Sequence, residues 1–126
     1  MKKVLIIEDD SFIQEMFAEK FAKYDAITLN ARTSAKGEKI AKEEMPDMII
    51  LDLVLPDGDG LELLKRLKSN AETKHIKVIV ITNMDSKEKM EEALSLGVED
   101  YFIKTNESFM SVVKMIKTYL GLKDAK

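Results

Sequence analysis

The sequence predicts an α/β fold in which five parallel strands form a doubly wound sheet with helices on both faces. Two observations support this fold class. Short apolar runs alternate five times with segments whose apolar residues recur at helical spacing. Four of these runs are continuous and rich in Ile and Val, which is typical of strands buried by helices on both faces. Because crossovers between parallel strands are right-handed, the alternation gives a layered α/β sandwich.

Each apolar run is expected to form a strand, and each is followed by an expected helix. The second run contains Thr28 and is more polar than the others, so we expect it at an edge of the sheet. The runs lie at residues 4–7, 26–29, 48–51, 78–81 and 101–103. The helical periodicity lies at residues 12–21, 40–45, 61–67, 90–97 and 112–120.

Local signals place several element ends. Gly97 and Gly121 resemble helix stops. Segment 56–60, Pro-Asp-Gly-Asp-Gly, is interpreted as a turn. It is not interpreted as a calcium loop, because Leu55 and Arg66 would occupy the first and last ligand positions. Two patterns resemble the capping boxes of helix starts, at Ser11-x-x-Gln14 and Asp85-x-x-Glu88.

The composition favours one globular domain spanning residues 1–126, without a linker or repeat. The net charge of −3 argues against direct nucleic-acid binding, which needs a basic face. The chain has no cysteine and one histidine, which excludes disulfides, zinc–thiolate sites and multi-histidine metal sites. His75 is expected in a surface loop. With no signal peptide and no apolar run long enough for a membrane, we expect a cytoplasmic location.

Polar side chains gather where the buried strands end. The first strand ends in acidic residues at positions 8–10, and the third strand contains Asp52. Thr82 and Asn83 follow the fourth strand, and Lys104 follows the fifth. Because the carboxyl ends of parallel strands share one edge of the sheet, we expect these groups to line one crevice.

The chemistry of these groups points to phosphoryl transfer. Carboxylates held close together repel each other unless a cation lies between them, and oxygen-only ligands favour Mg²⁺ over Ca²⁺. Lys104 supplies a positive charge, and Thr82 supplies a hydroxyl donor. A carboxylate nucleophile, a divalent cation and a lysine are sufficient to form an aspartyl phosphate, here on Asp52.

These stretches resemble the receiver domains of two-component response regulators, including the chemotaxis-type single-domain regulators. The similarity covers essentially the whole chain, and each motif has its expected spacing. The matching stretches are Val-Leu-Ile-Ile-Glu-Asp-Asp at 4–10, Ile-Leu-Asp-Leu-Val-Leu-Pro-Asp-Gly-Asp-Gly at 50–60, Val-Ile-Thr at 80–82 and Gly-Val-Glu-Asp-Tyr-Phe-Ile-Lys at 97–104. The resemblance implies the flavodoxin-like strand order 2-1-3-4-5.

The resemblance also implies a role for each polar group. Asp52 is similar to the phosphoacceptor, and Thr82 and Lys104 to the groups that hold the phosphoryl oxygens. Tyr101 resembles the aromatic switch that turns inward when Thr82 moves toward the phosphate. The resemblance implies that the surface of the fourth helix, fifth strand and fifth helix then changes its partner preference. The implied Mg²⁺ ligands are Asp9 directly, Glu8 through water, Asp52 and the backbone carbonyl of Val54.

The implied partners are a histidine kinase or histidine phosphotransfer protein as donor and a downstream protein as target. The donor is expected to dock near Phe12 and Ile13 and on the loop at Thr105. The protein is expected to be a monomer or a phosphorylation-dependent dimer, with no membrane partner.

Two positions depart from the family pattern. Thr105 follows Lys104 where proline is usual, so we predict a trans peptide bond and a shifted loop. Asn83 stands where a small residue is usual, and it should narrow access to the phosphoryl site. In the family, the positions of Val54 and Met84 help govern attack by water. Both residues are apolar here, which predicts slow loss of the phosphate.

Each group also has an ordinary structural interpretation when it is taken alone. The acids at 8–10 can form a solvated turn, Lys104 can pair with an acid, Thr82 can cap a helix, and Tyr101 can be half-buried core. Asp52 is harder to explain in this way, because an unpaired carboxylate inside an apolar strand costs several kcal/mol.

Three other functions fit the sequence less well. An aspartate-nucleophile phosphatase usually carries a second acid two residues after the nucleophile, where this chain has Val54. A receiver-like interaction domain that is never phosphorylated would not need the complete set of polar groups. A protein that binds flavin mononucleotide needs phosphate donors after the first strand, where this chain has acids.

Overall fold

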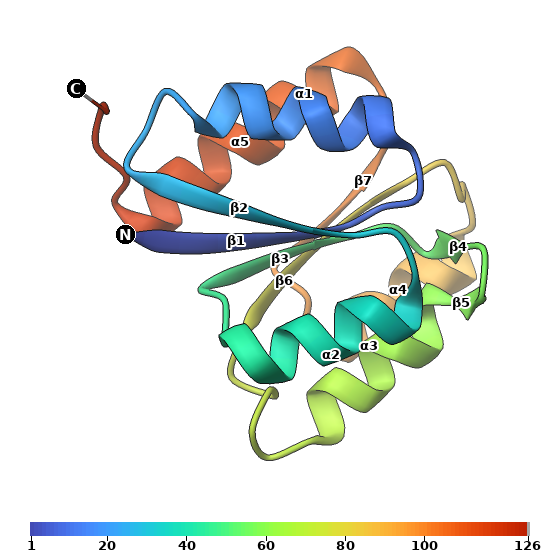
Figure 1. Cartoon of the computed structure of the whole chain (residues 1–126). Helices are drawn as coiled ribbons and strands as arrows, with labels where there is room; N and C mark the ends of the chain where they lie inside the picture. Colours follow the sequence, from blue (N-terminus) through green and yellow to red (C-terminus); the bar gives the residue numbers. More distant parts are fainter. Residues whose placement is uncertain (126) are drawn as a thin grey trace.

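The structure is a computed structural model, and it describes residues 1–125, which contain seven strands and five helices (Figure 1). The strands are β1 (Lys2–Ile7), β2 (Ala26–Ala31), β3 (Met48–Leu51), β4 (Val54–Leu55), β5 (Gly58–Asp59), β6 (Lys77–Thr82) and β7 (Asp100–Ile103). The helices are α1 (Ser11–Phe21), α2 (Ser34–Glu44), α3 (Gly60–Ser69), α4 (Lys87–Ser95) and α5 (Asn106–Leu120).

Five strands form one parallel sheet in the order β2-β1-β3-β6-β7. This is the predicted order 2-1-3-4-5, so the predicted fold class is confirmed. β2 lies at an edge as predicted, and its residues are mostly only half buried. Pairing of Ile7 with Leu51 across β1 and β3 brings the ends of these two strands to the same level. The polar residues that follow β1 and β3 therefore lie at the same edge of the sheet.

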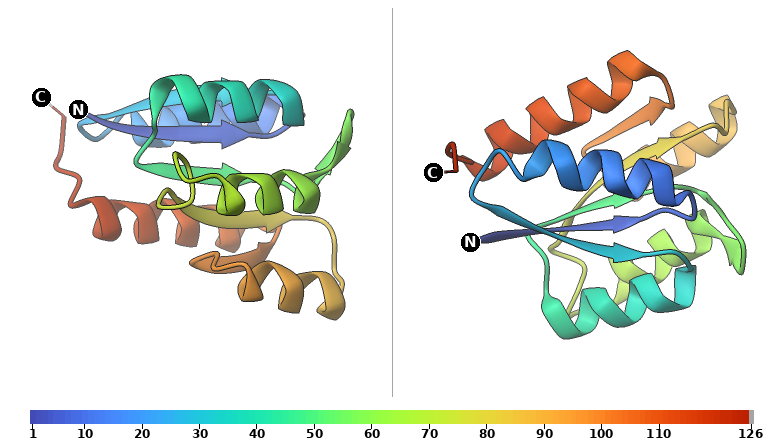
Figure 2. Two further views of the ribbon diagram at one scale, coloured as in Figure 1. Left: turned by 90° about the horizontal axis from the view of Figure 1, so that it is seen from below. Right: turned by 45° about the horizontal axis from the view of Figure 1, so that its top comes forward.

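The helices cover the sheet in two layers, which Figure 2 shows from two further directions. α1 and α5 lie on one face, and α2, α3 and α4 lie on the other. Alternate residues of each central strand point into the two layers. Along β1, for example, Val4 and Ile6 pack toward α1 and α5, whereas Leu5 and Ile7 pack toward α2 and α3. This two-sided burial is the physical reason for the continuous apolar runs.

A two-stranded antiparallel hairpin follows β3 and was not predicted as strand. Leu55 pairs with Gly58 and Val54 with Asp59, so Pro56 and its neighbour form the predicted turn between two very short strands. The Asp57 carboxylate accepts hydrogen bonds from the backbone N–H groups of Ser34 and Ala35, at 2.7 and 3.0 Å, at the start of α2. The loop that follows the third strand is thereby attached to a helix.

Both capping-box predictions are wrong about which residue caps the helix. Asp10, and not Ser11, is the N-cap of α1, and it accepts a hydrogen bond from the backbone of Phe12. Ser86, and not Asp85, is the N-cap of α4. In both cases the preceding or following residue offers a better-placed acceptor for the free N–H groups of the first turn. The structure confirms the predicted stop at Gly121, which has a φ of 61°.

α2 begins six residues before its predicted segment, and the reason is the size of its buried residues. The first turns of the side that faces β1 bury Ser34 and Gly37, which add nothing to the apolar periodicity. A Cβ atom on Gly37 would lie 2.7 Å from the end of the Ile7 side chain. Small residues therefore let this helix approach the sheet closely.

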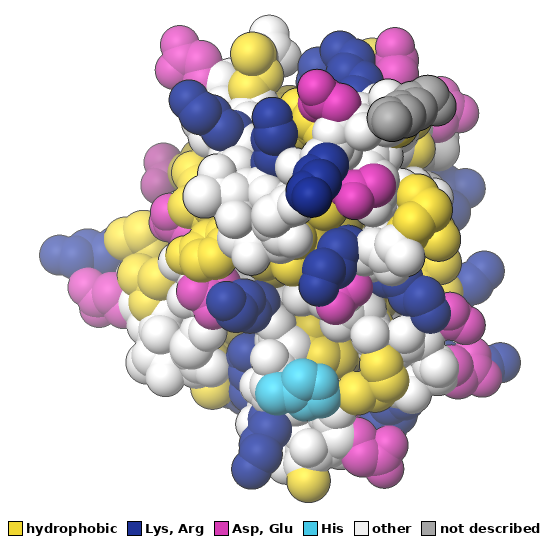
Figure 3. All heavy atoms as spheres, turned by 90° about the vertical axis from the view of Figure 1, so that its left-hand side faces the viewer, with side chains coloured by type: hydrophobic (Ala, Val, Ile, Leu, Met, Phe, Trp, Pro, Cys, Tyr) yellow, Lys and Arg dark blue, Asp and Glu magenta, His cyan; other side chains and the backbone are white. Residues whose placement is uncertain are grey.

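Within the described part of the chain, no helix is both long and apolar enough to cross a membrane. His75 lies exposed in the segment between α3 and β6, as predicted. Figure 3 shows this histidine on the end of the molecule where the strands begin, away from the polar strand ends.

Candidate functional site

The site is built from the carboxyl ends of four strands, which backbone hydrogen bonds hold together. The N–H of Asp52 donates to the carbonyl of Ile7 at 3.0 Å, which joins the end of β3 to that of β1. The N–H of Lys104 donates to the carbonyl of Thr82 at 2.9 Å, which joins β7 to β6. These hydrogen bonds fix the strand ends that carry the predicted crevice groups, which are Glu8, Asp52, Thr82 and Lys104.

Lys104 bridges two buried carboxylates. Its Nζ lies 2.7 Å from Glu8 Oε1 and 2.7 Å from Asp52 Oδ2. The Lys104 side chain is 10% exposed, and each carboxylate side chain is 5% exposed. One positive charge thus faces two negative charges in a place that is nearly closed to water. The ordinary interpretation of Lys104 as an ion-pair partner is correct, and the pairing places its ammonium group beside Asp52, the predicted phosphoacceptor.

The second oxygen of each carboxylate binds backbone. Asp52 Oδ1 accepts from the N–H of Val54 at 3.1 Å, and Glu8 Oε2 accepts from the N–H of Asp10 at 3.0 Å. Each carboxylate is therefore held through both of its oxygens, which fixes its orientation. An acceptor held in this way loses little freedom when another group binds it.

Burial of its carboxylate raises the pKa of Glu8 above the ordinary value of 4.5. The hydrogen bonds from Asp10 and Lys104 lower this pKa, but by less than burial raises it. The negative charge of Asp52 raises the pKa of Glu8 further. For Lys104, burial lowers the pKa, but the hydrogen bonds and charges of Asp52 and Glu8 outweigh it, so its pKa is raised. The cluster holds excess negative charge and keeps its ammonium group protonated.

Glu8 should therefore make stability depend on pH. In the pH range above 4.5 and up to its raised pKa, folded Glu8 keeps a proton that the unfolded chain has lost. Stability from this residue is complete below pH 4.5 and is lost as the pH rises through the folded pKa. In Glu8→Gln this loss should be absent. The measurement is the unfolding free energy of both proteins against pH in a chelating buffer, and parallel curves throughout would contradict the prediction.

Thr82 and Tyr101 are linked through one backbone segment. Thr82 is fully buried, and its Oγ1 accepts from the N–H of Met84 at 3.2 Å. The hydroxyl of Tyr101 donates to the carbonyl of the same Met84 at 2.7 Å. Burial raises the pKa of the Tyr101 hydroxyl, and the charges of Asp85 and Asp52 add to this. The Tyr101 ring is 9% exposed and packs in the core, more deeply buried than its ordinary interpretation implied.

Comparison with known proteins identifies this arrangement. Residues 4–117 match the model of the response regulator receiver domain. The polar-differentiation response regulator DivK of Brucella ovis is 33% identical over 120 residues, which are 95% of this chain and 97% of that protein. The chain belongs to the response regulator receiver domain family. It is a receiver of two-component signalling, and aspartate phosphorylation is general to such domains.

Solved receiver structures have the same fold over nearly the whole length. A CheY-like receiver domain protein from Methanospirillum hungatei has a TM-score of 0.86 at 25% identity, covering 96% of this chain and 94% of that one. The phosphorylated cyanobacterial phytochrome response regulator RcpA has a TM-score of 0.83 at 25% identity, with 94% and 92% covered. Receiver domains interact in general with histidine kinases and with downstream targets.

The donor set of this receiver fits a hard divalent cation, although the expected ligands are only partly gathered. Glu8 and Asp52 meet at Lys104, whereas the Asp9 side chain is exposed, and Arg32 binds the backbone carbonyl of Asp9 at 3.1 Å. Across residues 1–125, no three acidic or histidine side chains come together as a metal-holding group. The two buried carboxylates and one ammonium leave a net negative charge, and every donor is oxygen, which suits Mg²⁺.

The peptide bond after Lys104 is trans, as predicted. No cis peptide bond occurs in the described residues, so the bond between Lys104 and Thr105 is trans. Thr105 is the N-cap of α5, and its Oγ1 accepts from the N–H of Ser108 at 3.1 Å. The threonine therefore gives α5 a cap that proline could not supply, and Lys104 still reaches both carboxylates.

Gln14 is a site-supporting residue that the sequence did not reveal. It is 8% exposed, and its Nε2 donates to the carbonyl of Glu8 at 2.7 Å and to that of Ala31 at 3.2 Å. It thus holds the end of β1 beside the end of β2. Its position in the capping-box pattern suggested a bond to Ser11. The signal that points to its real role is an amide on the otherwise apolar inner face of α1.

Proposed function

We propose that this receiver accepts a phosphoryl group on Asp52 in a Mg²⁺-dependent reaction, with a phosphohistidine of a histidine kinase or histidine phosphotransfer protein as donor. The observation that carries the proposal is the buried Asp52 carboxylate, oriented by the Val54 N–H and facing the ammonium group of Lys104. A carboxylate with this burial and a charged neighbour at the strand ends is suited to nucleophilic attack on phosphorus. The protein assists only its own phosphorylation and dephosphorylation and turns over no other substrate.

In the proposed reaction an oxygen of Asp52 forms a bond to phosphorus while the phosphorus–nitrogen bond of the donor breaks. The imidazole nitrogen of the donor keeps the electron pair of that bond. Lys104 leaves its contact with Asp52 Oδ2 and binds a phosphoryl oxygen instead. Because Thr82 Oγ1 uses only an acceptor position for the Met84 N–H, its proton is free for another phosphoryl oxygen.

Glu8, Asp9, Asp52 and the backbone carbonyl of Val54 are the groups we propose to hold Mg²⁺. When bound, the ion lowers the repulsion between the carboxylates and the incoming phosphoryl group. The exposed Asp9 side chain must turn toward the cluster for this role. Its backbone carbonyl is already fixed by Arg32, so only the side chain needs to rotate.

The proposed output is a change in the surface formed by α4, β7 and α5, which binds a downstream protein. Movement of the Thr82 hydroxyl toward the phosphoryl group pulls on the Met84 backbone, to which the Tyr101 hydroxyl is also bound. Tyr101 belongs to β7, and Met84 lies just before α4. The chemical event at Asp52 is thereby connected to two of the three elements of that surface.

The direct test is intact mass spectrometry after incubation with acetyl phosphate and Mg²⁺. The native chain should gain the mass of one phosphoryl group, and Asp52→Asn should gain none. Asp47→Asn, the same change at the far end of the sheet, is the matched control and should be modified as the native chain is. Equal modification of the Asp52 variant, or no modification of the native chain, would refute the proposal.

The phosphate on Asp52 should be lost slowly. Val54 is 54% exposed, and Met84 is half buried, so neither side chain can orient an attacking water molecule. Replacing both with glutamine should shorten the phosphate lifetime by about tenfold or more, because positioned polar groups assist proton transfer from water. The measurement is decay of the phosphorylated mass. Leu94→Gln, on exposed α4 surface, is the control, and an unchanged lifetime in the double variant would contradict the explanation.

A further inference from the structure

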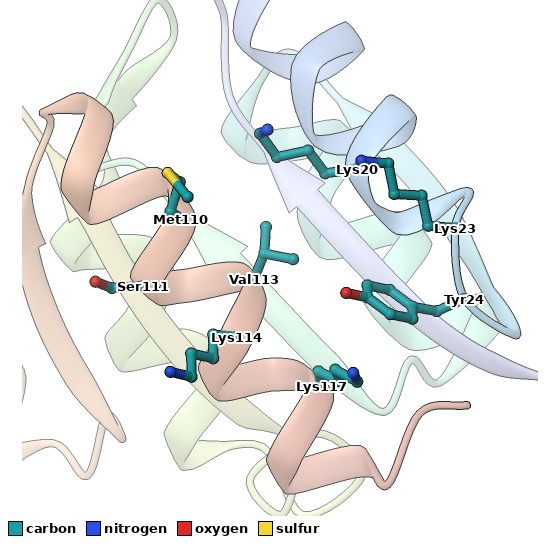
Figure 4. A pocket seen from close by; sticks show the side chains of 8 residues that line it. All are labelled: Lys20, Lys23, Tyr24, Met110, Ser111, Val113, Lys114 and Lys117. Carbon is teal, nitrogen blue, oxygen red and sulfur yellow. The ribbon is translucent and has the colours of Figure 1, made fainter. Parts of the chain in front are cut away.

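A groove separates the end of α1 from α5, on the side of the molecule away from the hairpin after Asp52. Its volume is about 450 Å³. Figure 4 shows residues from the end of α1 and the loop after it along one side and residues of α5 along the other. The groove is lined by Lys20, Lys23, Tyr24, Met110, Ser111, Val113, Lys114 and Lys117.

Half of the lining residues are lysines, although the chain as a whole carries a net charge of −3. Six other lysines of residues 1–125 form ion pairs with carboxylates, but none of these four does. The groove is also free of acidic lining residues. Within residues 1–125, positive charge is therefore concentrated along this groove without an ion-paired carboxylate, which favours an anionic partner.

The groove also has an apolar part. Val113 lies at its base with 8% exposure, and Met110 is 65% exposed on the rim. The Lys117 ammonium group lies over the Tyr24 ring, 4.9 Å from the ring centroid. This cation–π contact holds one positive charge at the edge of the groove. An exposed flexible methionine next to a buried aliphatic residue is suited to receive an apolar side chain.

We propose that this groove binds an acidic segment of a partner protein, in which carboxylates pair with the lysines and an apolar side chain contacts Met110 and Val113. A protein segment combines both chemistries along one short stretch. A nucleic acid would gain from the lysines, but it would need a longer basic track than the net negative charge of this chain provides. The interaction is separate from phosphoryl transfer and does not depend on Asp52.

The test uses the full ¹⁵N-labelled chain and a synthetic amphipathic peptide with glutamates on one helical face and leucines on the other. The amides of Tyr24, Val113 and Lys117 should shift on titration. Lys20→Glu with Lys117→Glu should weaken binding about tenfold or more, because attraction becomes repulsion at two places. Lys36→Glu with Lys39→Glu, on exposed positions of α2, is the matched control and should bind as the native chain does.

Three comparisons make the result decisive. The same peptide with glutamine in place of glutamate should bind much more weakly. Tighter binding of single-stranded DNA than of the acidic peptide at these residues would overturn the proposal in favour of a nucleic acid. Concentration-dependent shifts at these residues without peptide would overturn it in favour of a second copy of this chain. Equal weakening in the two double-lysine variants, or no shifts at the groove, would also overturn it.

Discussion

Replacement of Lys104 by methionine should lower the free energy of unfolding by about 3 kcal/mol at neutral pH. Methionine keeps most of the side-chain length but leaves Glu8 and Asp52 facing each other without the cation that now lies 2.7 Å from both. Removing one partner from a buried ionic group leaves an uncompensated charge, and here it leaves two of the same sign. The measurement is chemical denaturation in a chelating buffer.

The stability of Lys104→Met should depend on pH and on the Mg²⁺ concentration. Its loss of stability should shrink at acidic pH, where a carboxylate takes up a proton, and in excess Mg²⁺. Combining Lys104→Met with Glu8→Gln should restore part of the stability, since one of the two opposed charges is removed. Phosphoryl incorporation should fall about a hundredfold, because the proposed reaction would lose the positive charge that binds a phosphoryl oxygen.

Lys65→Met is the matched control for this change. Lys65 lies 3.2 Å from Glu62 and 3.8 Å from Glu92, but all three side chains are at least 40% exposed. Exposed pairs of this kind contribute at most about 1 kcal/mol. If Lys104→Met cost no more than Lys65→Met and its stability did not depend on pH, Lys104 would not hold the two buried carboxylates together as the geometry indicates.

The sheet and its polar edge could be predicted because they depend on patterns that are local in the sequence. Continuous apolar runs follow directly from burial on both faces, and the position of Asp52 and Lys104 at strand ends follows from the ends of those runs. What the pattern could not supply is contact between distant residues. The bond from Gln14 to the Glu8 carbonyl and the bonds from Asp57 to the start of α2 depend on the final packing.

The start of α2 shows a second limit. The first turns of this helix bury Ser34 and Gly37, whose small size is needed at the sheet and produces no apolar period. Periodicity detects burial only where the buried side chains are large.

The pairing of charges is also hidden from the sequence. The chain shows acids and a lysine at strand ends, but not that one ammonium group bridges Glu8 and Asp52 while Asp9 stays outside.

Gly60→Ala should be the second strongly disruptive change, with a loss of about 3 kcal/mol of stability. A Cβ atom at Gly60 would lie 2.5 Å from the carbonyl oxygen of Asp52 and 2.6 Å from the Cα of Leu53. Both are backbone atoms, which cannot move aside as a flexible side chain can. The N–H of Gly60 also donates to the Leu53 carbonyl at 2.8 Å, so the loop between them is closed at this point.

Gly37→Ala separates this close approach from the general effect of adding a methyl group within a helix. At Gly37 the added Cβ meets the flexible end of Ile7, and alanine is the better helix former by about 1 kcal/mol, so the net loss should be smaller. Gly60→Ala should also slow phosphoryl incorporation, because relief of the clash displaces the backbone of Asp52, whereas Gly37→Ala should leave the rate nearly unchanged. Denaturation and phosphoryl incorporation measured on both variants decide the point. Equal stability losses, or a normal rate in Gly60→Ala, would mean that the loop after Asp52 moves aside without displacing Asp52.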